Sequence, residues 1–459
     1  MNLDLSTLEF DASPLCAARL DALDPLRHFR DRFALPPDTT YLCGNCLGPP
    51  ARAAEGYVQE VLASWSRKGF RAHFTSPENW LSYEAQHLTA FMAAIVGAEP
   101  HETTLMNSLS VNLHLLLVSF YRPEGRRRLI LVEDGAFPSD QFVIDSHLRL
   151  RGLESETTLL RLERAPDTGL LDEVELQRVL EARGDEIALV LLGNTCFRTG
   201  QVLDIAAICA AAHEQGCMVA FDLAHAVGNV ELELHRWGVD FAVWCTYKYL
   251  NGGPGSLGGC FVHERHGREV PLQRLEGWWG NEPSSRFPGA LRATFRPAEG
   301  AAAWQLSSPP IVAMAALRPS LGIFADAGMS AIRRKSLLLG AYGISLIDTW
   351  LPGLCRVLTP REPSRRGCQL TVAVKADPRE LQTWLIERGV VCDAFGVDKI
   401  RIAPAPLYNT FSDVHRFVTR LAEYFGRTAD SSTARTASAP SPMPQRAKPL
   451  SPFSNTHKE

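Results

Sequence analysis

From about residue 50 onward, segments with the helical spacing of apolar residues alternate with short runs rich in β-branched and aromatic residues. These runs are continuously apolar, which is typical of strands in a parallel sheet that helices cover on both faces. The alternation predicts an α/β fold with a mostly parallel sheet. The predicted strands are Arg128–Val132, Ile187–Leu192, Met218–Asp222, Phe241–Cys245 and Gly259–Val262.

Two helices of this first unit have marked boundaries. Ser76 can cap a helix that has Pro77 at its first position and stops at Gly97. Asp204 can cap a second helix over Ile205–Gln215. Because the second helix connects two predicted strands, we expect it to pack against the sheet.

A second, smaller unit with an α+β pattern follows a Ser/Pro-rich stretch near residue 308. Its predicted elements are a helix over about Leu317–Trp350, a strand at Gln369–Val374, a helix after Asp377-Pro378 and a helix over about Ser412–Tyr424. The last stretch is rich in Ser, Thr, Pro and Ala and poor in apolar residues, so we expect it to be disordered. We therefore expect an N-terminal segment that packs with the small domain, a large α/β domain, a small α+β domain and a disordered tail, at residues 1–45, 46–315, 316–427 and 428–459.

The composition narrows the class of protein. A chain of 459 residues accommodates two or three domains, and 46% hydrophobic residues is ordinary for a globular protein. The balance of 47 Lys and Arg against 51 Asp and Glu argues against a nucleic-acid binder. The chain lacks both a run of 18 apolar residues and the pattern of a signal peptide. We expect a soluble, cytoplasmic protein whose partners include neither membrane nor nucleic acid.

Eleven cysteines are scattered through the chain, mostly within apolar segments. Their odd number and the length of the chain argue against a disulfide framework. Cys43 and Cys46 have CxxC spacing, which suits zinc or redox chemistry, but a second CxxC pair that would complete a structural zinc site is missing. We therefore expect reduced core thiols and no bound metal.

The strongest chemical signal is an aspartate and a lysine that follow two of the predicted strands. Asp222 ends one strand, and Lys248 lies between another strand and a glycine-rich turn. Taken singly, Asp222 also suits a turn cap, and Lys248 suits a solvent-seeking side chain. Together they suit pyridoxal phosphate, because its aldehyde forms a Schiff base with a lysine and its pyridine nitrogen needs a carboxylate partner. We expect this site at the carboxyl ends of the strands.

Several longer sequence words resemble those of the kynureninase family, which are fold-type-I pyridoxal-phosphate enzymes. They follow the family's order and cover about residues 40–425, which is more agreement than chance explains. The words are residues 44–48 (GNCLG, family form GNSLG), 106–115 (MNSLSVNLHL), 137–140 (FPSD), 222–229 (DLAHAVGN), 237–242 (WGVDFA), 247–251 (YKYLN), 277–280 (GWWG) and 401–409 (RIAPAPLYN).

The resemblance implies roles for individual residues. Lys248 would bond to the cofactor, and Tyr247 or Lys248 would handle protons, each through a pKa tuned toward neutrality by burial and the cofactor. Tyr247 and Trp278 would donate hydrogen bonds to the cofactor phosphate. Asp222 would hold the pyridine nitrogen, and Arg401 would bind the substrate α-carboxylate through its guanidinium. Further expected contacts are, for the cofactor, Leu109, Ser110, Phe137, Asp140, His225, Trp278 and Ser308 and, for the substrate's aromatic ring, His73 and Asn45.

Some of these implied roles have an independent physical argument. Leu109 and Ser110 would bind phosphate at a helix start, where free N–H groups and the helix dipole favour an anion. Phe137 would stack on the cofactor ring, although an aromatic residue after a strand suits a core position equally well. The role of His225 rests on the resemblance alone, because a single histidine is more often a core residue.

The chain departs from the family pattern at three positions. Gly193 stands where the family usually has a hydroxyl residue, Ser308 where animal members have an asparagine, and Gln305 where an arginine is frequent. These changes fall where the substrate's aromatic ring would be recognised. They bear on aryl specificity more than on the type of reaction.

The resemblance implies hydrolytic Cβ–Cγ cleavage of L-kynurenine, 3-hydroxykynurenine or a modified kynurenine to an anthranilate and L-alanine. Such an enzyme would act in tryptophan catabolism or a specialised biosynthetic branch, as a homodimer with the active site at the subunit interface. Two alternatives stay open: another reaction of the same cofactor class, such as that of a desulfurase, lyase or aminotransferase, and a catalytically silent homologue. Nothing in the sequence marks Cys392 as a persulfide carrier, and retention of Asp222 and Lys248 argues against a silent scaffold.

Overall fold

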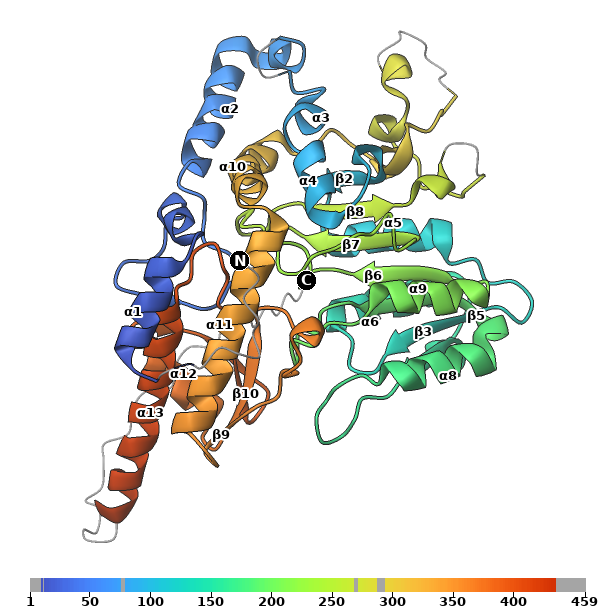
Figure 1. Ribbon diagram of the computed structural model, residues 1–459. Coiled ribbons are helices and arrows are strands. Elements are labelled where there is room, and N and C mark those ends of the chain that lie inside the picture. The colour runs from blue at the N-terminus through green and yellow to red at the C-terminus, as the bar shows by residue number, and fades with distance from the viewer. Residues whose placement is uncertain (1–9, 11, 76–78, 268–270, 287–293, 435–459) are drawn as a thin grey trace, which may run out of the picture.

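A computed structural model of the chain describes residues 10, 12–75, 79–267, 271–286 and 294–434 (Figure 1). Its central sheet has seven strands in the order β2-β8-β7-β6-β5-β3-β4. Neighbouring strands pair in parallel, except that β8 runs antiparallel to both β7 and β2. The strands are β2 (Thr103–Met106), β3 (Leu129–Glu133), β4 (Leu159–Leu162), β5 (Ile187–Gly193), β6 (Met218–Asp222), β7 (Phe241–Cys245) and β8 (Gly258–Val262).

The five predicted strands are confirmed, two with the same bounds and three within one residue. The sequence did not predict β2 and β4. Two threonines interrupt the apolar pattern of β2, and β4 is an edge strand with the exposed Arg161. Neither strand therefore shows the continuous apolar run that identifies a fully buried strand.

Helices pack on both faces of the sheet, which explains the continuous apolar runs. On one face, Leu131, Val190 and Phe221 pack with α8 and α9. On the other face, Ile130 and Leu189 pack with α5 and α6. The helices of the large unit are α2 (Ala54–Lys68), α3 (Tyr83–His87), α4 (Thr89–Val96), α5 (Leu109–Phe120), α6 (Pro138–Leu150), α7 (Ser155–Thr158), α8 (Glu173–Arg183) and α9 (Ile205–Glu214).

Of the two helices with predicted boundaries, one is confirmed and one is wrong as a single helix. Asp204 caps α9 by accepting a hydrogen bond from the N–H of Ala207 at 3.0 Å. Residues 76–78, the predicted start of the other helix, lie outside the described residues, and its described part is divided into α3 and α4. Leu88 leaves the helical region there (φ −129°), and the hydroxyl of Thr89 bonds to the carbonyl of Glu84. Gly97 ends α4 in the left-handed region, as predicted.

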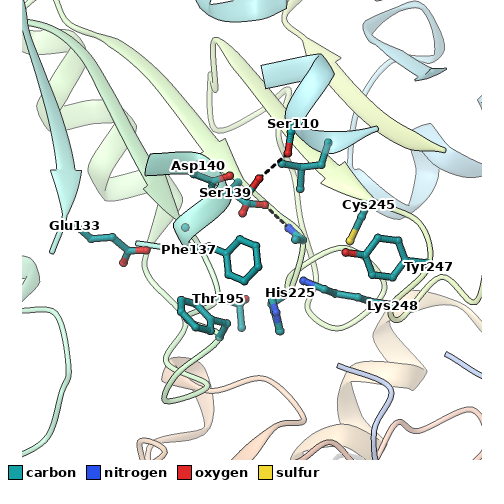
Figure 2. Close-up of a pocket in the computed structure, with 15 residues that line it drawn as sticks. Ser110, Glu133, Phe137, Ser139, Asp140, Thr195, His225, Cys245, Tyr247 and Lys248 are labelled. Atoms are coloured by element: carbon teal, nitrogen blue, oxygen red, sulfur yellow. Dashed lines mark hydrogen bonds between the residues drawn. The ribbon is translucent and has the colours of Figure 1, made fainter. Parts of the chain in front are cut away.

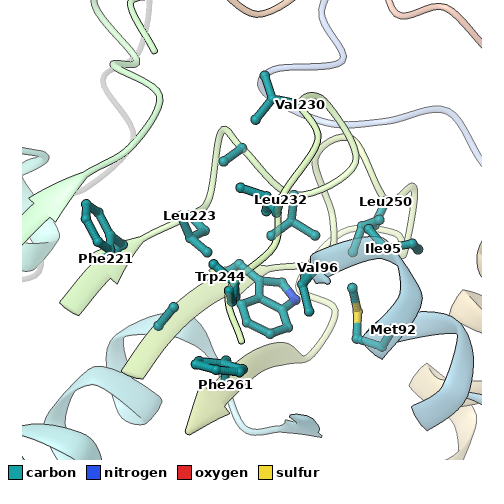
Figure 3. Close-up of a cluster of buried hydrophobic side chains, with 14 of the residues drawn as sticks. Met92, Ile95, Val96, Phe221, Leu223, Val230, Leu232, Trp244, Leu250 and Phe261 are labelled. Atoms are coloured by element: carbon teal, nitrogen blue, oxygen red, sulfur yellow. The ribbon is translucent and has the colours of Figure 1, made fainter. Parts of the chain in front are cut away.

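Trp244 is part of the large hydrophobic core and lies on β7, the strand that leads to Lys248 (Figure 3). Trp244 is fully buried and lies opposite Gly259 in the antiparallel pair β7–β8. A Cβ at position 259 would lie 2.3 Å from the indole nitrogen, so glycine leaves the room that the ring occupies. The packing therefore fixes the end of β7 and the direction of the segment that follows it.

The C-terminal unit contains a four-stranded antiparallel sheet in the order β12-β13-β10-β9. The long helix predicted over Leu317–Trp350 is wrong as one element, because α10 and α11 meet at Gly328 with a bend of 83°. Gly328 has φ 74° and ψ 133°, which a helix interior does not allow. The elements are α10 (Ile311–Ala327), α11 (Met329–Trp350), β9 (Cys355–Val357), β10 (Leu370–Val374), α12 (Pro378–Ile386), β12 (Asp393–Phe395), β13 (Lys399–Ile402) and α13 (Phe411–Ala434).

The N-terminal segment contacts this C-terminal unit. Helix α1 (Pro14–Leu23) packs against α13, and β1 (Thr40–Tyr41) pairs in parallel with β11 (Val390–Val391). Helix α13 continues to Ala434, so the first residues of the tail that was expected to be disordered are helical, whereas residues 435–459 lie outside the described residues. The domain boundaries given above stay predictions.

Within the part of the chain that the structure describes, no single helix is long and apolar enough to cross a membrane. The bent pair α10 and α11 reaches that length and composition only when its two helices are taken together.

Candidate active site

A pocket opens at the carboxyl ends of β3, β5, β6 and β7, where the loops after the strands meet the N-terminus of α5 (Figure 2). The empty space within it is about 650 Å³, a value that includes space open to solvent. The lining residues are Leu109, Ser110, Glu133, Phe137, Ser139, Asp140, Gly193, Thr195, Phe197, Asp222, Ala224, His225, Cys245, Tyr247 and Lys248.

The predicted aspartate and lysine both line this pocket. Asp222 is the last residue of β6, and its Oδ1 accepts a hydrogen bond from the N–H of Ala224 at 2.8 Å. Lys248 follows β7, is buried, and places its Nζ 5.8 Å from the ring centre of Phe137. Asp222 and Lys248 are 26 positions apart in the sequence. They line one cavity because they follow two neighbouring parallel strands, β6 and β7.

The charge of the pocket depends on two further carboxyl groups near Asp222. Burial, and then the neighbouring Asp222 with which it shares a hydrogen bond, raise the pKa of Asp140 well above its usual value. Burial also raises the pKa of Glu133 to about 7, although the guanidinium of Arg164 opposes this shift. The pocket therefore favours the neutral form of both carboxyl groups that lie beside Asp222.

Burial shifts the pKa of Tyr247 away from neutrality. Burial, and then the neighbouring Cys245, raise the pKa of its phenol above the ordinary value of 10. Burial by the chain itself therefore does not tune Tyr247 toward neutrality, because it disfavours the phenolate. Tyr247 can donate a hydrogen bond or a proton at neutral pH, but it cannot serve as a base.

His225 is a buried, neutral imidazole. Burial, and then the positive charges of Lys248 and Arg401, lower the pKa of His225 well below its usual value. Among the described residues, nothing forms a hydrogen bond with its Nδ1. A neutral ring suits a position against an uncharged face of a ligand.

The N-terminus of α5 forms the other end of the pocket. Its N-cap residue, Ser108, makes no hydrogen bond through its side chain, so the first N–H groups of the helix are left for another acceptor. The hydroxyls of Ser110 and Ser139 lie 2.7 Å apart beside them (Figure 2). Free N–H groups, hydroxyls and the positive end of the helix dipole suit a phosphate.

Phe137 lies on the wall of the pocket rather than in the core. Its side chain is 44% exposed, so the alternative that it is a core aromatic is wrong. Its ring makes an edge contact with that of Phe197 at 5.4 Å. The exposed face is open to a planar ligand.

The donor set of this pocket fits pyridoxal phosphate. A lysine, an aspartate, an anion-binding helix start and an aromatic wall line one cavity, as its aldehyde, pyridine nitrogen, phosphate and ring require. The buried Oδ1 of Asp140 and Nδ1 of His225 make no hydrogen bond with the described residues, so both are available to a ligand.

Five of the predicted site residues do not line the pocket. Arg401 on β13 is buried beside it, where its Nε donates to Asp393 at 2.7 Å and its Nη1 to the carbonyl of Phe197 at 2.7 Å. Asn45 is 1% exposed, and neither atom of its amide has a hydrogen-bond partner among the described residues. The other three are Trp278, Ser308 and His73, which are exposed or partly exposed.

The three departures from the family pattern occupy different places. Gly193 lines the pocket, and a Cβ there would lie 3.1 Å from Oε1 of Glu133. Gln305 lies outside the pocket lining and donates to the partly buried Glu84 at 2.7 Å. Ser308 is exposed. Gly193 is therefore the departure that changes the pocket wall of this chain.

Sequence reasoning gave no role to several residues that line the pocket. Glu133 ends β3 just as Asp222 ends β6, so the same signal, an acid after an apolar strand, would have found it. Ser139 lies within a motif that was recognised without a role for the serine. Ala224 likewise lies within a recognised motif, and three further lining residues gave no comparable signal: Thr195, Phe197 and Cys245.

Solved structures share this fold. A cysteine desulfurase from Thermococcus onnurineus NA1 matches with a TM-score of 0.72 and 16% identity over 87% of this chain and 98% of that chain. A C-DES mutant with glycine covalently linked to its PLP cofactor matches with a TM-score of 0.72 and 18% identity over 86% of this chain and 99% of that chain. The fold is that of the pyridoxal-phosphate-dependent enzymes of fold type I.

Sequence relatives define the family within this class. The chain is 48% identical to the kynureninase of Myxococcus xanthus over 417 residues, which are 90% of this chain and 97% of that protein. It is 49% identical to the kynureninase of Xanthomonas oryzae pv. oryzae over 88% of this chain and 96% of that protein. The family model of the kynureninase C-terminal domain matches residues 332–421. This chain belongs to the kynureninase family.

Proposed function

We propose that this chain is an enzyme that cleaves the Cβ–Cγ bond of L-kynurenine, or of a kynurenine with a substituted ring, by hydrolysis to an anthranilate and L-alanine. Pyridoxal phosphate is its cofactor. The observation that carries the proposal is the 48% identity to a kynureninase across nearly the whole chain, in a structure that places Lys248 and Asp222 in one pocket.

Each of the main pocket residues has a separate role in the proposed reaction. Bound pyridoxal phosphate supplies an aldehyde that bonds to amines and a ring that withdraws electrons from the substrate's Cα. Asp222 holds the pyridine nitrogen, and the start of α5 holds the phosphate. The amine of Lys248 takes and returns the proton at Cα. Tyr247 is the proton donor on the reaction path, because its phenol stays protonated at neutral pH.

Arg401 binds the α-carboxylate of the substrate in this proposal. Its guanidinium has five N–H donors, of which the structure uses one on each nitrogen, toward Asp393 and Phe197. One N–H on each terminal nitrogen is left, and these two can bind a carboxylate through both oxygens. The guanidinium of Arg401 packs over the ring of Phe395, with 4.6 Å between its central carbon and the ring centre.

The desulfurase alternative lacks a suitable thiol at the one position that sequence reasoning considered. Cys392 is 1% exposed, and burial raises its pKa to about 12. A persulfide carrier needs an accessible thiolate. The likeness to cysteine desulfurases at 16–18% identity concerns the fold.

We also propose a homodimer with a shared active site. Trp278, Ser308 and His73 are exposed or partly exposed and lie outside the pocket lining of their own chain. A second copy of the chain would let these residues reach the pocket from the other side. The cytoplasmic location stays a prediction.

The first test is release of fluorescent anthranilates from a panel of kynurenines by the purified, cofactor-loaded protein. Borohydride should attach the cofactor irreversibly to the peptide that contains Lys248. Lys248→Ala should lower kcat by roughly 10²- to 10⁴-fold, because it removes the group that moves the Cα proton. Lys375→Ala, at an exposed lysine of the C-terminal unit, is the matched control and should leave kcat unchanged. Release of alanine from cysteine but not from any kynurenine would favour the desulfurase alternative.

A further inference from the structure

The turn between β1 and α2 brings two cysteines together. The carbonyl of Cys43 accepts hydrogen bonds from the N–H groups of Cys46 at 2.9 Å and Leu47 at 3.1 Å. Such a turn holds the first and fourth Cα atoms within about 7 Å. A disulfide needs a Cα separation of about 4.4–6.8 Å, so the backbone already suits a bond between the two sulfurs.

The two thiols differ in exposure and in acidity. Cys43 is buried and Cys46 is exposed. A hydrogen bond between their side chains raises the pKa of Cys43 and lowers the pKa of Cys46. Burial and the charge of Asp393 oppose the lowering at Cys46, and the positive charges of Arg401 and Lys248 support it. The pair therefore combines an accessible thiol of lowered pKa with a buried thiol next to it, which is the arrangement of reactive Cys-X-X-Cys motifs.

The turn is connected to the proposed active site on two sides. The N–H of Gly48 donates to the carbonyl of Tyr247 at 2.8 Å, next to Lys248. Cys43 forms an isolated parallel bridge with Ala403, two residues after Arg401 on the same chain segment. The family form of this word is GNSLG, so Cys46 places a thiol where the family has a hydroxyl.

The other nine cysteines do not share these properties. All eleven are free, and Cys46 is the exposed one among them. Burial raises the pKa of Cys209, Cys368 and Cys392 to about 12. Oxidation should therefore be selective for the turn.

We propose that Cys43 and Cys46 are a redox-active pair that hydrogen peroxide converts to a reversible disulfide at the edge of the substrate site. The Cys46 thiolate attacks one peroxide oxygen, the O–O bond breaks, and the departing hydroxide takes a proton to become water. The Cys43 thiol then attacks the sulfur of the Cys46 sulfenic acid, and the S–O bond breaks. The thiol proton leaves with the hydroxide as a second water. Two thiols lose two electrons, the peroxide gains them, and a dithiol reverses the change by exchange.

The effect on activity rests on the proposed function. The disulfide removes a negative charge beside Arg401 and closes a ring around Asn45, whose buried amide has no hydrogen-bond partner among the described residues. Both changes affect the substrate side of the pocket rather than the phosphate end. Oxidation should therefore change KM for the substrate more than cofactor affinity.

The test treats the cofactor-loaded enzyme with peroxide, alkylates the remaining thiols and maps them by mass spectrometry. We expect Cys43 and Cys46 to be protected together, the other nine cysteines to stay alkylated, and dithiothreitol to reverse the protection. In the same samples, kcat/KM should change at least about tenfold and return to its starting value on reduction. Cys46→Ser, which restores the family residue, should lose the response relative to its own untreated sample. Cys355→Ser, at a partly buried cysteine of the C-terminal unit, should keep it.

The outcomes separate this proposal from the proposed function. Protection of the pair in a protein that turns over no kynurenine would support the disulfide and contradict the function. If the enzyme cleaves kynurenine but Cys43 is still alkylated after peroxide treatment, the redox pair is contradicted and the proposed function is not. Oxidation of Cys46 to the sulfonic acid in place of a disulfide would have the same meaning. A disulfide that leaves kcat/KM unchanged would overturn the link to the substrate site.

Discussion

Three carboxyl groups share one end of the pocket, and the charge that each carries depends on its neighbours. Asp222 accepts a hydrogen bond from Ala224, whereas burial raises the pKa values of Asp140 and Glu133. Glu133 forms a buried ion pair with Arg164, whose Nε also donates to the carbonyl of Asp134. The charge of Glu133 therefore affects both the pocket and the ion pair that holds Arg164, which lies just after β4, in place.

The raised pKa of Glu133 predicts a stability that depends on pH. Its pKa rises from 4.5 to about 7 on folding, so the folded state binds a proton that the unfolded state releases. The stabilisation is complete below pH 4.5 and is lost as pH rises through 7, by about 3 kcal/mol in total. Glu133→Gln cannot titrate, so the apparent free energy of unfolding of wild type relative to this variant should fall by about that amount between pH 4.5 and 8.

Urea titrations at several pH values measure this difference. Glu175→Gln, at an exposed residue of α8 with an i,i+3 ion pair, is the control and should show no such trend. A wild-type curve that stays parallel to that of Glu133→Gln would mean that Glu133 titrates at its ordinary pKa.

At the scale of elements, the apolar pattern predicts strands better than it predicts helix breaks. The apolar runs predicted the strands correctly because each of these strands is buried on both faces of the sheet. The apolar pattern from Leu317 to Trp350 continues through Gly328, although the chain bends there by 83°. Helical spacing records which residues are buried, and both α10 and α11 bury apolar residues, so the pattern does not show the bend.

Two glycines of these helices test this explanation. A Cβ at Gly328 or at Gly322 would meet open space, but only Gly328 has a positive φ. Gly328→Ala should lower the free energy of unfolding by about 1–3 kcal/mol, because alanine is strained in that conformation. Gly322→Ala, within α10, should raise it by about 0.5–1 kcal/mol through helix propensity. Equal effects of the two changes in urea titrations would refute a backbone origin.

At the scale of the whole molecule, the proposed dimer predicts that inactive subunits complement one another. Trp278 is exposed on its own chain and Lys248 is buried in the pocket. In a mixed dimer of Lys248→Ala and Trp278→Ala subunits, one site would receive both changes and the other neither. A refolded equal mixture should therefore recover about a quarter of wild-type activity at limiting cofactor.

The matched control mixes Lys248→Ala with Asp222→Ala. Both residues line the pocket of the same chain, so every site of the mixed dimer would carry one defect and activity should stay absent. Recovery in neither mixture, or elution of the cofactor-loaded protein as a monomer, would contradict a shared site.

Sequence alone determined the features that depend on neighbouring residues. Continuous apolar runs specified five strands, and Asp222 and Lys248 were identified because an acid and a lysine follow such runs directly. Because the carboxyl ends of parallel strands lie at the same edge of a sheet, the two residues were expected to lie close together. The family resemblance followed from the same short words.

Tertiary structure alone decided the features that depend on residues far apart in the chain. Burial by distant segments sets the pKa of Tyr247 and of Glu133, and the pKa of Cys46 depends on Cys43 and on charges at positions 248, 393 and 401. Arg401 reaches the site edge from a different sheet, and Trp278 lies away from its own chain's pocket. The sequence pattern records the burial of a residue, but the free energy of a charge depends on which groups surround it, and only packing brings those groups together.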